Sequence, residues 1–227
     1  MNKGIKDKII KETKSLLGAI IIVLLLRAFV IQAYKIPSGS MIPTLIVGDH
    51  LLASKFTYGI KMPYMDLKCC EWRKPKKGEI VIFEFPLDPS KDFVKRVVGT
   101  EGDTVEMKAG VLYINSNKVP IKYIADYSYI DTSGRREFCK RLEENLFNHK
   151  HSVLWCDGYE DMRDYGPYVV PKNSIFVMGD NRDHSNDSRF WGTVPLVKVK
   201  GSPLIIYFPW DSGEGKINFN RFFKLPK

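Results

Sequence analysis

The sequence EIVIFEF at Glu79–Phe85 and the sequence DFVKRVV at Asp92–Val98 decide the fold. Both segments are short and rich in the β-branched and aromatic residues that strands favour. A loop that contains Pro86 and Pro89 separates them. The two segments therefore predict two strands joined by this loop.

Further short segments of the same kind lie along the chain, at Val105–Met107, Val111–Ile114, Ser174–Met178 and Leu204–Phe208. The first two flank Lys108–Ala109–Gly110 and predict a hairpin. Strands do not alternate with helical patterns, and there is no internal repeat. We therefore expect a mainly β fold, built on an antiparallel sheet.

The composition permits a folded domain and gives little support to nucleic-acid binding. The chain has 227 residues, of which 44% are hydrophobic, and this is enough for one substantial domain or two small ones. The net charge is +9, but residues 1–34 hold 6 basic and 2 acidic side chains, which leaves 29 basic against 24 acidic in the remainder. No arginine-rich run or finger motif is present, so nucleic acid is not expected as a partner.

The amino terminus has the pattern of a membrane anchor. Residues 1–15 contain five lysines, and Leu16–Tyr34 (LLGAIIIVLLLRAFVIQAY) is apolar except for Arg27 and Gln32. A segment of this length just suffices to span a bilayer. The lysine excess before it predicts a cytoplasmic tail at 1–15, a transmembrane helix at 16–34 and an extracytoplasmic remainder.

Two other interpretations of this apolar segment remain open. A cleaved secretory signal would carry small residues at the cleavage spacing, but Ala28 and Ala33 are flanked by larger side chains. A buried helix of a soluble protein would fit the run Leu16–Leu26 equally well. Arg27 is expected near one membrane interface because a charge in mid-bilayer costs a few kcal/mol.

Residues 121–168 differ from the rest of the chain, because they are polar and rich in tyrosine and charge. We expect an inserted α+β segment here, with one helix near Arg135–Asn148. The extracytoplasmic β domain would then consist of residues 35–120 and 169–227.

The inserted segment carries two cysteines, Cys139 and Cys156. Outside the cytoplasm a disulfide between them is expected, and it would contribute roughly 3 kcal/mol. A zinc site that adds His149 and His151 is the alternative, although the spacing matches no common structural zinc site.

Three segments concentrate turn formers and reactive side chains: PSGSMIP at Pro37–Pro43, Lys95–Arg96, and GDNRDHSNDSR at Gly179–Arg189. Alone, they are typical of a turn, a solvated pair of charges and a polar loop. Together, behind an anchor, they resemble the bacterial type I signal peptidases, which are membrane-anchored serine proteases with a Ser/Lys dyad. The sequences PSGSMIPTL, GDHLLASKFTYG, GEIVIFEFP, DFVKRVVGTEGD and GDNRDHSNDSRFWG resemble successive motifs of that family.

The resemblance implies that Ser40 is the nucleophile and Lys95 the general base. A lysine with a pKa near 10.4 is charged at neutral pH and accepts no proton, so Lys95 must be buried. Alternation along the strand supports this, because Phe93 and Val97 share its face while Arg96 points to the opposite side.

The resemblance also implies supporting roles. Ser185 would orient the Lys95 amine, and the Ser38 hydroxyl with the Ser40 N–H would form the oxyanion hole. Gly39 would let the backbone approach closely. Two ion pairs would brace the site without reacting, and they are Arg96 with Asp180 and Asp187 with Arg189.

A Ser-His-Asp mechanism is the chemical alternative, because His50 follows Ser40 closely and His184 lies among aspartates. The resemblance gives neither histidine a catalytic role. No metal or other cofactor is implied, because a Ser/Lys pair needs only water.

The expected substrates are secretory preproteins, cleaved after a small-x-small (Ala-x-Ala) site at the outer face of the bacterial cytoplasmic membrane. We expect a pocket lined by Ile80–Phe85 and Met41, a monomer, and contact with membrane lipids. Four aromatic residues near the carboxy terminus could make this lipid contact at the membrane interface, or they could instead pack against the β core: Phe208, Trp210, Phe222 and Phe223. The other candidates are a dedicated-substrate peptidase of the same family, a catalytically silent anchored binding domain and a soluble self-cleaving repressor-type protease.

Overall fold

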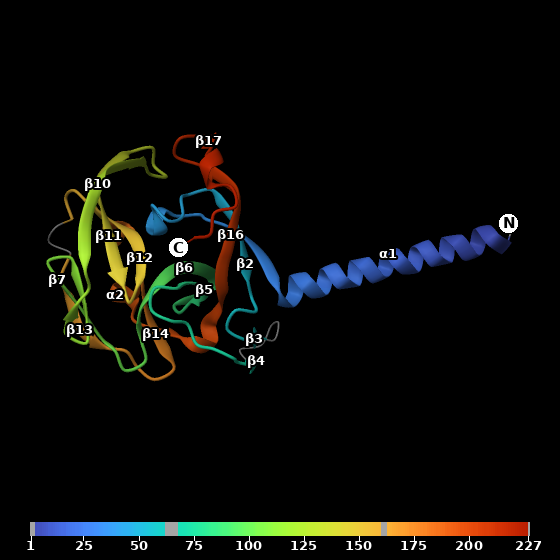
Figure 1. Ribbon diagram of the computed structural model, residues 1–227, viewed down its shortest axis with the longest axis horizontal. Coiled ribbons are helices and arrows are strands. Elements are labelled where there is room, and N and C mark those ends of the chain that lie inside the picture. The colour runs from blue at the N-terminus through green and yellow to red at the C-terminus, as the bar shows by residue number, and fades with distance from the viewer. Residues whose placement is uncertain (1–2, 62–67, 160–162, 227) are drawn as a thin grey trace.

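The computed structural model describes residues 3–61, 68–159 and 163–226. A long amino-terminal helix, α1 (Lys3–Phe29), projects from a β domain that holds the rest of the chain (Figure 1). Within the described residues, no helix combines the length and the apolar composition needed to cross a bilayer.

The helix ends earlier than the apolar pattern of residues 16–34 predicts. Ile31–Lys35 forms strand β1, which pairs with β2 (Asp49–Ser54). The Lys55 backbone N–H donates to the Val30 carbonyl at 2.9 Å, and sheet pairing thus takes over where the helix stops. Apolar composition alone does not distinguish these two states, so the predicted helical end at Tyr34 is wrong.

The largest sheet has eight strands in the order β1-β2-β16-β5-β6-β14-β15, with β17 paired to β16. All these neighbours are antiparallel, as predicted. The predicted strands at 79–85 and 92–98 are confirmed as neighbours, although Pro89 lies within a strand rather than in a loop. The remaining members of this sheet are β5 (Ile80–Phe85), β6 (Asp88–Thr100), β14 (Ser174–Met178), β15 (Val194–Pro195), β16 (Val199–Asp211) and β17 (Lys216–Ile217).

Strand β5 is apolar from Ile80 to Phe83 because both of its faces are covered there. Val81 and Phe83 pack with Val97 on one face, whereas Ile80 and Ile82 pack with Leu51 on the other. A strand buried on both faces has no polar alternation. This burial makes β5 and β6 the rigid centre on which the candidate site is built.

The predicted hairpin is confirmed as β7 (Thr104–Lys108) and β8 (Val111–Ile114). Ala109 and Gly110 form its two-residue turn with φ of 47° and 78°, the backbone of a primed turn. A four-stranded sheet with the order β13-β7-β8-β9 contains this hairpin. The smaller elements are β9 (Asn117–Lys118), β13 (Tyr165–Val169), the pair β3 (Ile60–Lys61) and β4 (Lys68–Cys70), and the short helix α2 (Ser188–Trp191).

The inserted segment forms a three-stranded antiparallel sheet of β10 (Ile121–Ile130), β11 (Arg136–Leu146) and β12 (His149–Cys156). The helix predicted near Arg135–Asn148 is wrong, because these residues form β11 and its turn. The described part of residues 121–168 contains strands and no helix, and β13 crosses the predicted boundary at 168. Buried carboxylates at Glu137 and Glu144 hide the alternation of β11, since they occupy positions where an apolar residue would mark a strand.

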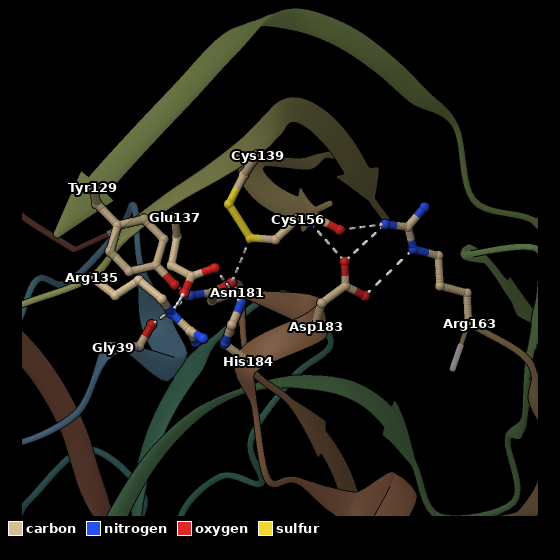
Figure 2. Close-up of a disulfide and its surroundings, with 10 residues drawn as sticks. All are labelled: Gly39, Tyr129, Arg135, Glu137, Cys139, Cys156, Arg163, Asn181, Asp183 and His184. Atoms are coloured by element: carbon tan, nitrogen blue, oxygen red, sulfur yellow. Dashed lines mark hydrogen bonds and ion pairs between the residues drawn. A yellow bond between two sulfur atoms is a disulfide. The ribbon is translucent and has the colours of Figure 1, made fainter. Parts of the chain in front are cut away.

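A disulfide closes the end of this sheet, as predicted. Cys139 and Cys156 lie opposite each other on β11 and β12, with an S–S distance of 2.04 Å (Figure 2). Their sulfur atoms are therefore not available as zinc ligands. The disulfide packs with Ile42 and Ile46, so the inserted sheet rests on the segment that follows Ser40.

Candidate active site

The predicted nucleophile and base meet at the junction of two elements. Ser40 lies in a short 3₁₀ turn (Gly39–Met41) that follows β1, and Lys95 lies on β6. The Lys95 Nζ donates to Ser40 Oγ at 2.5 Å and to the Val94 carbonyl at 3.2 Å. Lys95 is 3% exposed and Ser40 is 8% exposed, so the contact is shielded from solvent.

The surroundings of Lys95 favour its neutral form. Burial lowers the pKa of Lys95 to about 8, although the negative charges of Asp187 and Asp180 oppose this shift and Arg189 reinforces it. The Lys95 Nζ lies 5.2 Å from the ring centroid of Phe93, on the strand face that alternation predicts. A neutral fraction of Lys95 is thus available near pH 8 to accept a proton.

A pocket of about 300 Å³ opens beside this contact. Two stretches of chain form most of its wall, at residues 36–41 and 92–95, and His184 and Asn186 complete it. Met41 contributes to the wall, as predicted. The predicted contribution of Ile80–Phe85 is wrong, because Ile80, Val81, Ile82 and Phe83 are buried in the core.

Ser38 and Ser185 are both near the site but differ in their surroundings. Ser38 lines the pocket and caps the turn at Gly39–Met41 without using its hydroxyl for the cap. Ser185 is 5% exposed, and its hydroxyl has no hydrogen-bond partner within the described residues. A hydrogen bond from Ser185 to Lys95 therefore stays a prediction.

The first expected ion pair is present and fully buried. Arg96 binds both oxygens of Asp180, through Nε at 2.8 Å and Nη2 at 2.7 Å, and its Nη1 donates to the Gly78 carbonyl at 2.7 Å. Burial would raise the pKa of Asp180, but the charge and hydrogen bonds of Arg96 outweigh it and hold that pKa below its ordinary value. Thr44 also donates to this carboxylate at 2.5 Å. The pair joins β6 to the Gly179–Arg189 loop.

The second expected pair has the same bidentate form. Arg189 donates to Asp187 through Nε at 2.8 Å and through Nη2 at 2.9 Å. The Asp187 carboxylate also accepts the Gly179 N–H at 3.0 Å. This pair holds the loop that carries Ser185 in a closed turn.

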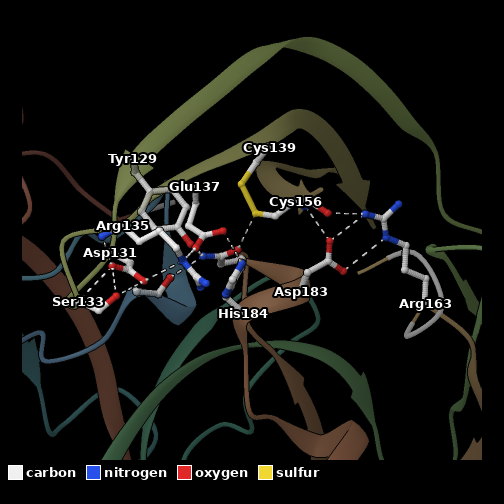
Figure 3. A network of polar contacts seen from close by, with 12 residues as sticks. Tyr129, Asp131, Ser133, Arg135, Glu137, Cys139, Cys156, Arg163, Asp183 and His184 are labelled. Carbon is white, nitrogen blue, oxygen red and sulfur yellow. Dashed lines mark hydrogen bonds and ion pairs between the residues drawn. A yellow bond between two sulfur atoms is a disulfide. The ribbon is translucent and has the colours of Figure 1, made fainter. Parts of the chain in front are cut away.

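Neither histidine of the alternative mechanism contacts the Ser40 hydroxyl within the described chain. His50 lies on β2, where its ring packs edge-on against Tyr207 and Phe208. His184 lines the pocket, but its Nε2 lies 3.4 Å from Glu137, whose carboxylate also accepts from Arg135 at 2.7 Å (Figure 3). The geometry therefore favours Lys95 over a histidine as the partner of Ser40.

Several residues that were not identified from the sequence join the inserted sheet to the Gly179–Arg189 loop. Arg182 binds Glu144 through Nη1 at 2.9 Å and through Nη2 at 2.6 Å, and His151 lies 3.2 Å from the same carboxylate. Burial would raise the pKa of Glu144, but Arg182 and His151 hold it at about 2. The Asp183 carboxylate accepts the Cys156 N–H at 2.7 Å (Figure 2). Charged residues in the inserted segment are the only sequence signal for these contacts, and they do not identify their partners.

A serine hydroxyl that accepts from a buried amine beside an open pocket is the arrangement of a serine hydrolase. The family model described as "Signal peptidase, peptidase S26" matches residues 9–208. Signal peptidase I of Pseudomonas fluorescens is 37% identical over 214 residues, which cover 89% of this chain and 73% of that protein. Signal peptidase I of Buchnera aphidicola from Schizaphis graminum is 34% identical over 253 residues, which cover 92% of this chain and 81% of that protein.

The chain therefore belongs to the signal peptidase family, peptidase S26, and is a serine endopeptidase. A solved structure of a signal peptidase I from Enterococcus faecalis aligns at 25% identity over 57% of this chain and 97% of that chain. The TM-score of this alignment is 0.34.

Proposed function

We propose that Ser40 and Lys95 are the catalytic dyad with which this peptidase removes N-terminal signal peptides from secreted preproteins. The contact of 2.5 Å between the Lys95 Nζ and Ser40 Oγ carries the proposal. Both groups are buried, and burial is what brings a lysine amine to the neutral state that a general base requires.

The reaction follows from this contact. Neutral Lys95 accepts the Ser40 proton as Oγ attacks the scissile carbonyl carbon, which gives a tetrahedral intermediate and an ammonium at Lys95. The ammonium then protonates the leaving amine, and the mature protein departs. Lys95, neutral again, accepts a proton from water as the water oxygen attacks the acyl carbon. The Lys95 ammonium then returns this proton to Ser40 Oγ as the bond between Oγ and the acyl carbon breaks, which releases the signal peptide and restores both groups.

Ser38, the Ser40 N–H and Ser185 are assigned supporting roles. The Ser38 hydroxyl lines the pocket and is not used for capping, so it is free to join the Ser40 N–H as an oxyanion donor. The Lys95 ammonium has three N–H donors, of which Ser40 and Val94 accept two. We assign the third to the buried hydroxyl of Ser185, which has no other partner in the described structure.

The two ion pairs are assigned a bracing role. Arg96 with Asp180 and Asp187 with Arg189 are bidentate and buried, and bidentate pairs restrict geometry strongly. The first pair connects β6 to the loop around Ser185, and the second closes that loop, so together they keep β6 and the loop beside Ser40.

The size of the pocket supports a preference for small side chains at alternating positions of the substrate. A peptide lying extended between residues 36–41 and 92–95 places every second side chain on the same side. Ile36, Met41, Phe93 and Val94 restrict the pocket, whose volume is about 300 Å³. Two small residues separated by one of any size, as in Ala-x-Ala, fit this arrangement.

The apolar part of helix α1, from Leu16 to Phe29, supports attachment to a membrane, with the amino terminus in the cytoplasm. The helix projects from the β domain (Figure 1), and its large aliphatic side chains between Leu16 and Leu26 remain about half exposed, with Leu16 at 63% and Leu26 at 48%. A lipid bilayer would cover them, and the five lysines of residues 1–15 favour the cytoplasmic side. The disulfide agrees with an extracytoplasmic β domain.

Exposed aromatic residues support lipid contact by the β domain itself. Phe56 and Trp72 are 48% and 46% exposed, and their ring centroids lie 4.3 Å apart. Phe56 adjoins Lys55, whose Nζ donates to the Ala28 carbonyl near the end of α1. Of the aromatic residues expected at the interface, Phe223 is 70% exposed, whereas Phe208, Trp210 and Phe222 are half-buried. We expect a monomer, because one chain supplies the dyad and the pocket.

The test is cleavage of a purified preprotein with an Ala-x-Ala site by detergent-solubilised enzyme. Wild type should release the mature protein, whereas Ser40→Ala and Lys95→Ala should lose at least about 1,000-fold in kcat/KM. Lys91→Ala is the matched control, since Lys91 lies on the same strand but has a side chain that is 65% exposed. Folded Lys95→Ala with wild-type activity would disprove the Ser/Lys mechanism.

A further inference from the structure

Asn181 holds the backbone on both sides of Ser40. It is fully buried, and its side-chain Nδ2 donates to the Gly39 carbonyl at 3.0 Å. Its backbone N–H donates to the Ser40 carbonyl at 3.1 Å. The peptide group before Ser40 and the one after it are therefore both held by one residue.

The first of these bonds helps to fix the direction of the Ser40 N–H, together with the Ile42 N–H, which donates to the same Gly39 carbonyl at 3.1 Å. The Gly39 carbonyl and the Ser40 N–H belong to the same planar trans peptide group, in which they point in opposite directions. A donor that fixes this carbonyl therefore also fixes the N–H on the other side. That N–H is the backbone donor of the proposed oxyanion hole. A hydrogen bond to the carbonyl also polarises the amide and strengthens its N–H as a donor.

Tyr129, on strand β10 of the inserted sheet, fixes the Asn181 side chain in turn. The second N–H of the Asn181 Nδ2 donates to the Tyr129 hydroxyl at 2.9 Å (Figure 2). Both amide hydrogens are thus used. The reverse amide orientation would place Oδ1 against the carbonyl of Gly39, which only accepts, so this carbonyl selects a single orientation and the Tyr129 hydroxyl accepts the remaining amide hydrogen.

The position of Tyr129 is itself fixed by the inserted sheet. Tyr129 lies opposite Glu137 in the pairing of β10 with β11, and it packs on the cluster around the Cys139–Cys156 disulfide. The Asn181 Oδ1 lies 3.7 Å from the Cys156 sulfur. Burial raises the pKa of Tyr129 to about 12, so its hydroxyl is neutral at any pH of assay.

We propose that Tyr129 is a positioning residue for the hydrolysis, acting through Asn181 to aim the Ser40 N–H at the oxyanion. This inference rests on the proposed role of Ser40 and gives the inserted sheet a function in the reaction. Because the oxyanion forms only in the transition state, the contribution falls on kcat and not on KM.

Tyr129→Phe tests the proposal, since it removes the acceptor and keeps the ring. We expect kcat to fall about 10-fold with KM within about twofold of wild type, a smaller loss than removal of an oxyanion donor would give. Tyr127→Phe is the matched control, because Tyr127 lies on the same strand and packs on the same cluster but accepts neither Asn181 proton. It should leave kcat unchanged.

A double-mutant cycle shows whether Tyr129 acts through Asn181. Asn181→Ala should lower kcat about 100-fold, and adding Tyr129→Phe to it should lower kcat no further. A full additional 10-fold loss would overturn the proposal, as would wild-type kcat in Tyr129→Phe. If Tyr129→Phe lost activity and also had a lower thermal unfolding midpoint, the loss would be attributed to impaired folding and would count against the positioning role of Tyr129.

A peptide aldehyde ending in Ala-x-Ala separates positioning from a structural effect. Ser40 Oγ adds to the aldehyde carbon and places the former carbonyl oxygen in the oxyanion hole, whereas the corresponding peptide alcohol cannot react. Tyr129→Phe should weaken aldehyde binding by the same factor as kcat and leave alcohol binding unchanged. Equal weakening of both would refute the proposal. If Ser40→Ala still cleaved the preprotein, the proposed function would fail instead.

Discussion

Gly179 faces the hydroxyl of Ser185 so closely that no larger residue fits. A Cβ atom on Gly179 would lie 2.3 Å from the Ser185 Oγ and 2.4 Å from the Ser40 carbonyl oxygen. Gly179→Ala must therefore displace the Ser40 backbone, and a displacement of about 1 Å in an active site costs about 100-fold in rate. Steady-state kinetics should detect a loss of that order in kcat/KM. Gly18→Ala, where a Cβ meets nothing within 4 Å, should have wild-type activity.

The pH dependence of cleavage should follow Lys95. Its pKa is lowered to about 8, and only the neutral amine accepts the Ser40 proton. The value of kcat/KM should therefore fall about tenfold per pH unit below pH 8 and become constant above it. Assays between pH 6 and 10, on a peptide without groups that titrate there, would measure this profile. A kcat/KM that stays constant from pH 6 to 9 would contradict the assignment of Lys95 as the base.

Burial of the charged Lys95 side chain lowers the free energy of unfolding of the protein. The folded-state pKa of about 8 lies below the ordinary value of 10.5. The cost is therefore fully present below pH 8 and disappears as pH rises towards 10.5. Lys95→Met should raise the free energy of unfolding at pH 7 by about 1–3 kcal/mol and abolish activity. Denaturation at pH 7 and pH 10 would show a gain that shrinks at the higher pH. Lys91→Met, at an exposed position, should change stability little at either pH.

The Cys139–Cys156 disulfide should stabilise the protein measurably. It closes a loop with a sequence separation of 17, for which chain entropy gives roughly 3 kcal/mol. Replacing both cysteines by serine should lower the thermal unfolding midpoint by roughly 6–12 °C. A reductant should lower the midpoint of wild type by a similar amount and leave that of the double variant unchanged. If the reductant affected both proteins equally, the stabilisation would not come from this bond.

The two central strands of the fold could be predicted because their apolar and β-branched residues are typical of buried strands. The β-branched residues of β5, and the positions of Phe93 and Val97 two residues before and after Lys95, indicate buried strands before any contact is known. The meeting of Ser40 with Lys95 could not be deduced in this way, since 55 residues separate them and only the resemblance of their motifs to a known family connects them.

The inserted sheet escaped prediction for physical reasons. Glu137 has a near partner in Arg135, but a local pattern does not show that this carboxylate is buried. Glu144 is buried because Arg182, which lies 38 residues away in sequence, neutralises it, and a local pattern does not reveal so distant a partner. The same holds for Tyr129, which lies 52 residues from Asn181 in a segment without a motif. Strand β1 was missed for a different reason, since its pairing with β2 is what ends the apolar helix.

Lys55 joins the end of α1 to the sheet through two bonds. Its Nζ donates to the Ala28 carbonyl at 2.5 Å, and its backbone N–H donates to the Val30 carbonyl at 2.9 Å. These two bonds restrict rotation of the helix relative to the β domain. Ser40 follows Phe29 by only eleven residues. Under the proposed topology, Ser40 therefore attacks the scissile bond at a fixed distance from the membrane surface. The distance of a site from the membrane would then select the point of cleavage together with its sequence.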